Sequence, residues 1–299
     1  MGFGNQHHTR TPFATSKSVI FVIPLQAYIR HTYRRDSMPQ DSDGDSAGGV
    51  LLLPSPTTAT TNPTPRKPKK PLTHFLSLPL HHAPDLQTSI DILTNDISTY
   101  FPSLNIPSGA IRPARAAHLT LGVMSLTSAE MVERAVELLK STDMDALLQE
   151  VTTIDNMAEL PDPKAPMSFR VSLQGLATMG PPNKTSVLYT VPYDPTNRLL
   201  PFTNALRKCF IAEGLIQDES RELRLHVTVL NTVYAKKGGR KNKGRQITLD
   251  VRDLVQEFGE RVFVKEVEVN RVAICLMGAK DKDGIKGAAG YEEIFGKTL

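Results

Sequence analysis

The sequence predicts a domain of the α+β class, built from two similar lobes around a central cleft. Two features lead to this prediction. Segments typical of strands and of helices alternate in each half of the chain from about residue 72 onward. A tetrad of the form histidine, aliphatic, threonine, aliphatic occurs once in each half, at 118–121 and at 226–229. We therefore expect one tetrad in each lobe, with the open faces of the lobes turned toward each other.

Each tetrad alternates polar and apolar side chains, which is the pattern of a half-buried β-strand. The aliphatic residues would face a core. In the first strand, His118 and Thr120 would then share the open face, and in the second strand His226 and Thr228 would do the same. A single strand of this kind is usually structural. An imidazole beside a hydroxyl, presented twice at corresponding places, instead favours acid–base chemistry on a phosphate.

The first half is expected to run strand, helix, strand, helix. The expected bounds are a strand at 73–78, a helix at 85–101, a strand at 115–125 and a helix at 127–141. Apolar residues in 85–101 recur at spacings of four and three, which places them on one helix face, and Pro102 ends this helix. Thr127 and Glu130 form a capping box at the start of the last helix.

The second half repeats this scheme. The expected elements are strands at 168–176 and 186–191, a helix at 197–213, a strand at 222–232, a helix at 251–258 and a single strand at 262–277. Gly214 marks the end of the helix at 197–213. In both halves the tetrad strand thus follows a unit of strand and helix, which is why we expect two similar lobes.

The N-terminal part differs in composition from the rest. We expect residues 1–70 to form a disordered extension and 71–299 to form the folded domain, with interleaved lobes at approximately 71–150 and 151–299. The basic run at 65–70 is of the kind read by nuclear import receptors, although a solvated linker would look the same. We expect a nuclear location, with the cytoplasm also possible. Because residues 1–35 lack Asp and Glu, a mitochondrial transit segment is the alternative.

Composition limits the class of protein. Of the 299 residues, 40% are hydrophobic and 22% are charged, which is ordinary for a chain with a sizeable core. The net charge of +4 allows an anionic partner without requiring one. Cys209 and Cys275 are too few for a disulfide framework and lack the spacing of a zinc site. No run of 18 apolar residues occurs, so no membrane partner is expected.

The two tetrads resemble those of the two-histidine (2H) phosphoesterases, which include the 2′,5′-RNA ligase-like proteins. The resemblance extends over the stretches 72–80, 118–124, 197–216 and 225–232. It is closest to the branch that contains the phosphoesterase-like domain of activating signal cointegrator 1 complex subunit 1 and the nucleotide-binding domain of A-kinase anchoring protein 7. It implies lobes made of antiparallel-rich sheets with helices on their outer faces. A KH-type Gly-x-x-Gly loop, which precedes this region in the cointegrator subunit, is not found in residues 1–70.

The function implied by the resemblance agrees with the chemistry of the tetrads. We expect a metal-independent phosphoesterase without cofactor that acts on RNA phosphodiester bonds or 2′,3′-cyclic phosphate ends. Its catalytic residues would be His118, Thr120, His226 and Thr228. The resemblance also implies a subunit of a helicase-containing transcription-coactivator complex, or of an RNA or alkylation-damage repair complex. The alternative is a non-catalytic nucleotide- or RNA-binding subunit of such a complex. Which histidine acts as acid is left open.

Five further residues are candidates for substrate binding: Arg224, Tyr234, Phe75, Lys236 and Lys237. Arg224 has the strand parity of His226 and is either a phosphate ligand or a charge at the rim. The two aromatic residues either stack on a base or belong to the core. The two lysines begin a basic loop at 236–245, which either embraces a polyanion or is an ordinary exposed loop.

Overall fold

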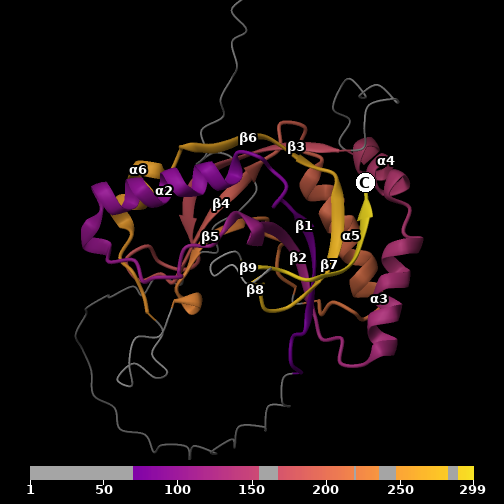
Figure 1. The fold of residues 1–299 in the computed structure, drawn as a ribbon. Helices are drawn as coiled ribbons and strands as arrows, with labels where there is room; N and C mark the ends of the chain where they lie inside the picture. The colour runs from indigo at the N-terminus through magenta and orange to yellow at the C-terminus, as the bar shows by residue number, and fades with distance from the viewer. Residues whose placement is uncertain (1–69, 155–167, 219, 236–246, 282–288) are drawn as a thin grey trace, which may run out of the picture. The chain divides into compact units, whose positions relative to one another are not determined.

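A computed structural model of the chain describes residues 70–154, 168–218, 220–235, 247–281 and 289–299 (Figure 1). Their secondary structure consists of two antiparallel four-stranded sheets, a two-stranded ribbon and helices, which confirms the α+β class. Apart from Lys70, the expected extension with its basic run lies outside the described residues, as does the basic loop with Lys236 and Lys237. Within the described part of the chain, no helix combines the length and the apolar character needed to cross a bilayer.

The first sheet has the strand order β10-β7-β1-β2. Its strands are β1 (His74–Pro79), β2 (His118–Met124), β7 (Arg271–Leu276) and β10 (Glu293–Thr298), and all neighbours are antiparallel. Helix α2 (Leu86–Tyr100) and the 3-10 turns η1 (Pro102–Leu104) and η2 (Ala114–Ala116) connect β1 to β2. Helices α3 (Ala129–Ser141) and α4 (Met144–Ile154) follow β2. Two strands from the end of the chain thus complete the sheet that carries the first tetrad.

The second sheet has the strand order β5-β4-β3-β6. Its strands are β3 (Phe169–Thr178), β4 (Val187–Tyr193), β5 (Val227–Asn231) and β6 (Val262–Val269), again antiparallel throughout. Helix α5 (Leu199–Ala212) lies between β4 and β5, and the 3-10 turn η3 (Thr232–Tyr234) and helix α6 (Arg252–Phe258) lie between β5 and β6. The ribbon consists of β8 (Lys280–Asp281) and β9 (Ala289–Gly290).

The two tetrad strands lie where the sheets meet. Strand β2 is the last strand of its sheet, β5 is the last strand of the other, and the two contact each other. The segment before η2 joins this junction, since Ile111 forms an isolated antiparallel bridge with Leu230 of β5. The fold therefore brings together two histidines that are far apart in the sequence.

Alternation along β2 and β5 separates a core face from an open face. Leu119, Leu121 and Val227 are almost completely buried in the main hydrophobic core. His118 and Thr120 alternate with these residues and stay half-buried. Burying each aliphatic side chain contributes roughly 2 kcal/mol, which is enough to fix which face of the strand turns inward. The polar side chains are thereby held on the opposite face.

The predicted single strand at 262–277 is wrong. It consists of two strands that belong to different sheets, because β6 pairs with β3 whereas β7 pairs with β1 and β10. Asn270 lies between them. Apolar residues continue on both sides of this crossover, so the pattern alone did not reveal it. Helix α4 and strand β10 were not predicted.

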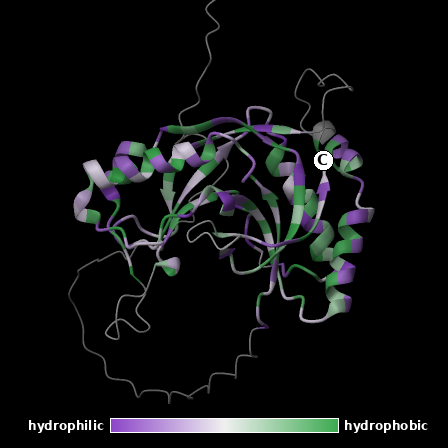
Figure 2. Ribbon diagram, viewed as in Figure 1, coloured by the Kyte–Doolittle hydropathy of each residue, from purple (hydrophilic) through white to green (hydrophobic). Residues whose placement is uncertain are grey.

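Helix α3 begins one residue later than the predicted capping box requires. Its N-cap is Ser128, whose hydroxyl accepts a hydrogen bond from the Met131 backbone N–H at 3.3 Å, instead of Thr127. Ser128 has the extended backbone (φ −130°, ψ 157°) that an N-cap adopts. The helix buries Ala135 and Leu139, and Figure 2 shows hydrophobic and hydrophilic residues side by side along it.

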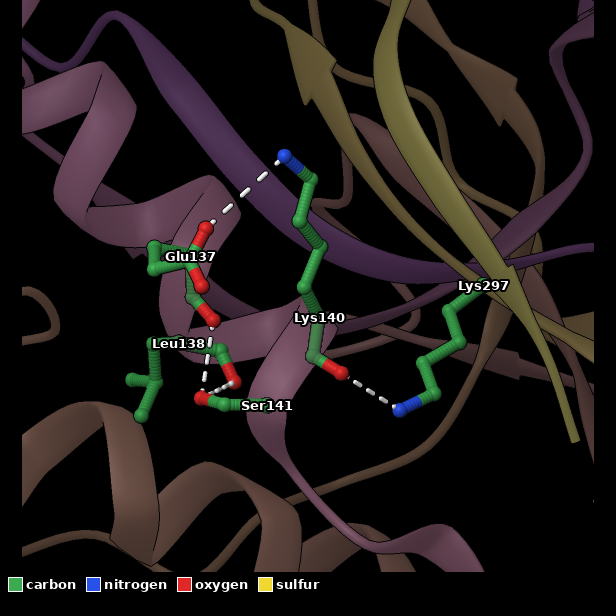
Figure 3. Close-up of polar contacts among 5 residues, drawn as sticks. All are labelled: Glu137, Leu138, Lys140, Ser141 and Lys297. Carbon is green, nitrogen blue, oxygen red and sulfur yellow. Dashed lines mark hydrogen bonds and ion pairs between the residues drawn. The ribbon is translucent and has the colours of Figure 1, made fainter.

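The C-terminal end of α3 is tied to β10 (Figure 3). The Lys297 ammonium donates hydrogen bonds to the carbonyl oxygens of Lys140, at 2.8 Å, and Thr142, at 2.6 Å. The Ser141 hydroxyl donates to the Glu137 carbonyl at 2.8 Å. A cation at this position satisfies carbonyls that the helix leaves unpaired and complements the negative end of its dipole. Strand β10, at the edge of the first tetrad's sheet, is thus anchored to α3.

Candidate active site

His118 is the first residue of β2, and its ring is oriented by the chain just before it. The imidazole Nδ1 lies 2.8 Å from the carbonyl oxygen of Ala116, in turn η2. Because a carbonyl can only accept a hydrogen bond, Nδ1 carries the proton. In the neutral ring, Nε2 is then the atom with a free lone pair, available to take a proton.

His226 repeats this arrangement in the second sheet. It lies immediately before β5, and its Nδ1 is 2.8 Å from the carbonyl oxygen of Arg224. Both histidines therefore bind the carbonyl of the residue two positions earlier. Both rings are held in the same tautomer, with Nε2 as the reactive nitrogen.

Aromatic side chains support both rings. The centroid of the His118 ring is 4.9 Å from that of Phe75 and 4.9 Å from that of Tyr291. His226 packs edge to face against Tyr189 of β4, with 5.2 Å between centroids. Packing of this kind restricts rotation of the imidazoles, so that the direction of Nε2 is set before any ligand arrives.

The pKa values of both histidines are lowered. Burial lowers the pKa of His118 to about 4, with smaller contributions from the charges of His226 and Arg112, while the hydrogen bond to Ala116 acts in the opposite direction. Burial also lowers the pKa of His226, against the effect of the Arg224 carbonyl. The electrostatic effect of His226 on His118 is consistent with the contact between their strands. Near pH 7, both free rings are neutral and both can accept a proton.

The two threonines lie on the same face as the histidines of their strands. Thr120 is paired with Ser77 of β1, and Thr228 is paired with Tyr189, which itself contacts His226. Both threonines are half-buried. Their hydroxyls can donate hydrogen bonds to the non-bridging oxygens of a phosphate placed between the imidazoles.

Sequence reasoning missed Arg112, Tyr189 and Tyr291. Arg112 is 7% exposed, and its guanidinium carbon lies 3.7 Å from the centroid of the Tyr234 ring. The Tyr234 hydroxyl is 3.5 Å from that of Tyr291. Burial raises the pKa of Tyr291 to about 12. Arg112 and Tyr291 lie in irregular segments where no periodic pattern marks them, whereas Tyr189 could have been found from its position in a predicted strand.

A cavity of about 330 Å³ adjoins His118 on the open face of the first sheet. Phe75, Ser77, Cys275 and Tyr291 line it together with His118. The Ser77 hydroxyl lies 3.8 Å from the Cys275 sulfur, and burial raises the pKa of this thiol to about 11. Cys275 therefore stays protonated near neutral pH and is not a thiolate nucleophile.

The remaining substrate-binding candidates occupy different environments. Phe75 is 3% exposed and supports the His118 ring, whereas Tyr234 is 40% exposed and covers Arg112. Arg224 has an exposed side chain whose positive charge lowers the pKa of Tyr189, against the larger effect of burial, so it lies on the His226 side. Among the residues that the structure describes, no three His, Cys, Asp or Glu side chains are grouped as metal ligands would be.

Comparison with known protein families gives a match to the AKAP7 2′5′ RNA ligase-like domain over residues 72–285, which is most of the chain. The chain belongs to this family. It is thereby a member of the 2H phosphoesterase superfamily, as the resemblance of the tetrads implied. The matched region contains both tetrads and Arg112.

Individual relatives are distant. An uncharacterized protein of Schizosaccharomyces pombe is 24% identical over 223 residues, covering 74% of this chain and 92% of the yeast protein. Activating signal cointegrator 1 complex subunit 1 of mouse is 23% identical over 206 residues, covering 67% of this chain and about half (54%) of the mouse protein. Escherichia coli LigT complexed with 3′-AMP is a similar solved structure, with a TM-score of 0.42, 16% identity and coverage of 77% of this chain and 98% of LigT.

Proposed function

We propose that this protein is a metal-independent phosphoesterase that acts on RNA phosphodiester bonds or 2′,3′-cyclic phosphate ends. The observation that carries the proposal is the matched anchoring of two imidazoles, each with Nδ1 bound to a backbone carbonyl at 2.8 Å. One imidazole is at the start of β2 and the other is immediately before β5, and these two strands contact each other. Membership of the 2H phosphoesterase superfamily supports the same reaction class.

Two oriented imidazoles can provide both proton transfers that the reaction needs. One neutral ring takes a proton from a 2′-hydroxyl or from water, and the other ring, in its protonated form, gives a proton to the departing oxygen. The free protein holds both rings neutral. A phosphate anion bound between them favours the charged form and so raises their pKa values, which lets one ring take up the proton it must donate. Thr120 and Thr228 stabilise the charge that develops on the non-bridging oxygens.

The test is cleavage of short RNAs, including RNAs with 2′,3′-cyclic phosphate ends, in buffer containing EDTA. We expect His118→Ala and His226→Ala each to lower kcat by roughly 10²- to 10⁴-fold, the usual contribution of a positioned acid or base. His82→Ala is the matched control, because this exposed histidine binds the Glu268 carbonyl instead of facing the tetrads. Cleavage that survives substitution of both tetrad histidines would reject the proposal.

A second candidate function is binding of a nucleotide or RNA without turnover. It is favoured by burial, which lowers the pKa of His118 to about 4 in the free protein. A ring whose pKa stays low when the nucleotide is bound remains neutral near pH 7 and cannot serve as the acid. This candidate predicts saturable binding of a nucleotide together with no cleavage of any RNA sequence tried. The histidine variants would then change affinity alone.

We also propose that the protein acts as a subunit of a nuclear complex of the coactivator or repair type. The support is the similarity to the mouse cointegrator subunit over 206 residues. Affinity purification of the tagged full chain should recover a helicase-containing assembly, and a fluorescent fusion should enter the nucleus. Recovery of the chain alone would reject the proposed complex. Import into mitochondria that depends on residues 1–35 would reject the nuclear location.

A further inference from the structure

The side chain of Arg112 is buried without a full set of partners. It is 7% exposed, and its Nη2 atom is inaccessible and has no hydrogen-bond partner. Among the residues that the structure describes, no carboxylate forms an ion pair with Arg112. A guanidinium is always charged, and removing it from water without an anion is unfavourable. A buried arginine of this kind therefore needs a reason to be retained.

The position of Arg112 is set by rigid structure on both sides of the junction. Its backbone N–H donates to the Val229 carbonyl of β5 at 2.9 Å, one residue beyond Thr228. Six residues later, the chain reaches His118 at the start of β2. Arg112 is thus fixed to β5 by its backbone, on a short segment that leads directly into His118.

The surroundings of the guanidinium are aromatic and face His118. Its carbon stacks on Tyr234 at 3.7 Å, Tyr234 and Tyr291 are joined through their hydroxyls, and the Tyr291 ring is 4.9 Å from the His118 ring. The charge of Arg112 acts on both His118 and Tyr291. The guanidinium also hydrogen-bonds the Tyr291 side chain. Stacking and this bond hold the plane of the guanidinium but supply no anion, so Nη2 of this fork of N–H donors is oriented and still lacks an acceptor.

We propose that Arg112 is the phosphate-binding cation of this site, and that its missing partner is an anionic oxygen of the substrate phosphate. The proposal rests on the proposed function for the placement of that phosphate between the tetrads. Tyr234, 40% exposed, is the ring that lies over the guanidinium. Arg112 thereby favours substrates that carry a phosphate anion over the corresponding nucleosides.

The test measures binding and needs no turnover. Isothermal titration calorimetry on the full chain uses three probes: inorganic phosphate, adenosine 3′-monophosphate and adenosine. Arg112→Met keeps the length of the side chain without its charge, and Arg112→Lys keeps the charge without the fork. Arg134→Met is the matched control, since Arg134 is an exposed arginine of α3 that forms an ion pair with Glu213.

We expect Arg112→Met to weaken binding of adenosine 3′-monophosphate by roughly 10- to 100-fold, the usual effect of a hydrogen bond to a charged group. Arg112→Lys should give an intermediate loss, adenosine should bind the variants and the wild type equally, and Arg134→Met should bind all probes as the wild type does. Unchanged nucleotide affinity in Arg112→Met, with an unaltered circular dichroism spectrum, would overturn the proposal. If Arg112→Met does not fold, Arg112→Lys decides, because equal affinity in that variant excludes recognition by the fork.

This titration and the RNA cleavage assay together separate this proposal from the proposed function. Binding that depends on Arg112 in a protein that cleaves no RNA would reject the phosphoesterase and keep the phosphate site. Cleavage that depends on both histidines, with nucleotide affinity independent of Arg112, would keep the phosphoesterase and reject the phosphate site.

Discussion

Replacing His118 by asparagine removes one titrating ring, and we expect it to make the free energy of unfolding less dependent on pH. In the folded protein the pKa of His118 is lowered from 6.5 to about 4, mainly by burial. Between these two values, the unfolded chain binds a proton at this position that the folded chain does not bind. The contribution of this ring to the free energy of unfolding is therefore fully present above the unfolded pKa, and it is lost as the pH falls toward the folded pKa.

The magnitude follows from these two pKa values. Between about pH 7 and about pH 4.5, the linkage relation gives a loss of about 2 kcal/mol for this ring, after allowance for solvent screening of a half-buried group. Asparagine does not titrate in this range, and its amide N–H can still donate to the Ala116 carbonyl. The wild type should thus lose about 2 kcal/mol more than His118→Asn over this interval.

The assay is urea denaturation followed by circular dichroism at a series of pH values for both proteins. The change in the free energy of unfolding is compared between them, which cancels the contributions of the other groups. His82→Asn serves as a control for the loss of any histidine, because His82 is exposed and does not belong to a tetrad. Equal pH dependence in the wild type and His118→Asn would show that the ring is not held neutral by the fold.

Three further substitutions test how the site is supported. Asp194→Ala should lower the free energy of unfolding by about 2 to 3 kcal/mol in urea denaturation, because this buried carboxylate accepts hydrogen bonds from Leu199 N–H at 2.8 Å and from two groups of Thr196. An effect below the experimental error would contradict its role as an anchor of α5. Leu121→Ala should lower the free energy of unfolding by about 2 to 5 kcal/mol, whereas Leu72→Ala, at a residue that is 53% exposed, should change it little. Equal effects of the two substitutions would disprove the assignment of Leu121 to the inner face of β2. Tyr189→Ala should lower kcat about tenfold. Tyr189→Phe keeps the ring beside His226 and should retain activity. A lower kcat in both variants would show that the tyrosine hydroxyl, and not the ring, supports His226.

The alternation of side chains made much of the fold predictable. The helix expected at 85–101 is α2, and the strand expected at 115–125 is β2, because each buries one regular stripe of apolar residues. The same signal failed at 262–277. There, an apolar run continues through Asn270 although the chain passes from the second sheet to the first. Periodicity reports burial, and burial does not say against which sheet a strand packs.

The candidate site shows the same division. His118 and His226 could be proposed from the sequence because a repeated polar pair on a strand is a local pattern. Arg112 could not be proposed, since it lies in an irregular segment and owes its position to a backbone bond with β5 and to a ring from η3. Tyr291 comes to His118 from the far end of the chain. Such residues are placed by tertiary structure alone.

The central claim is that one phosphate is held by the Nε2 atoms of both tetrad histidines. It is tested most directly by titrating adenosine 3′-monophosphate into protein labelled with ¹⁵N at histidine and recording the imidazole nitrogen resonances. The Nε2 signals of His118 and His226 should shift together, with one dissociation constant, and the pKa of at least one ring should rise. A shift confined to one histidine, or two signals that saturate at different ligand concentrations, would contradict a shared phosphate.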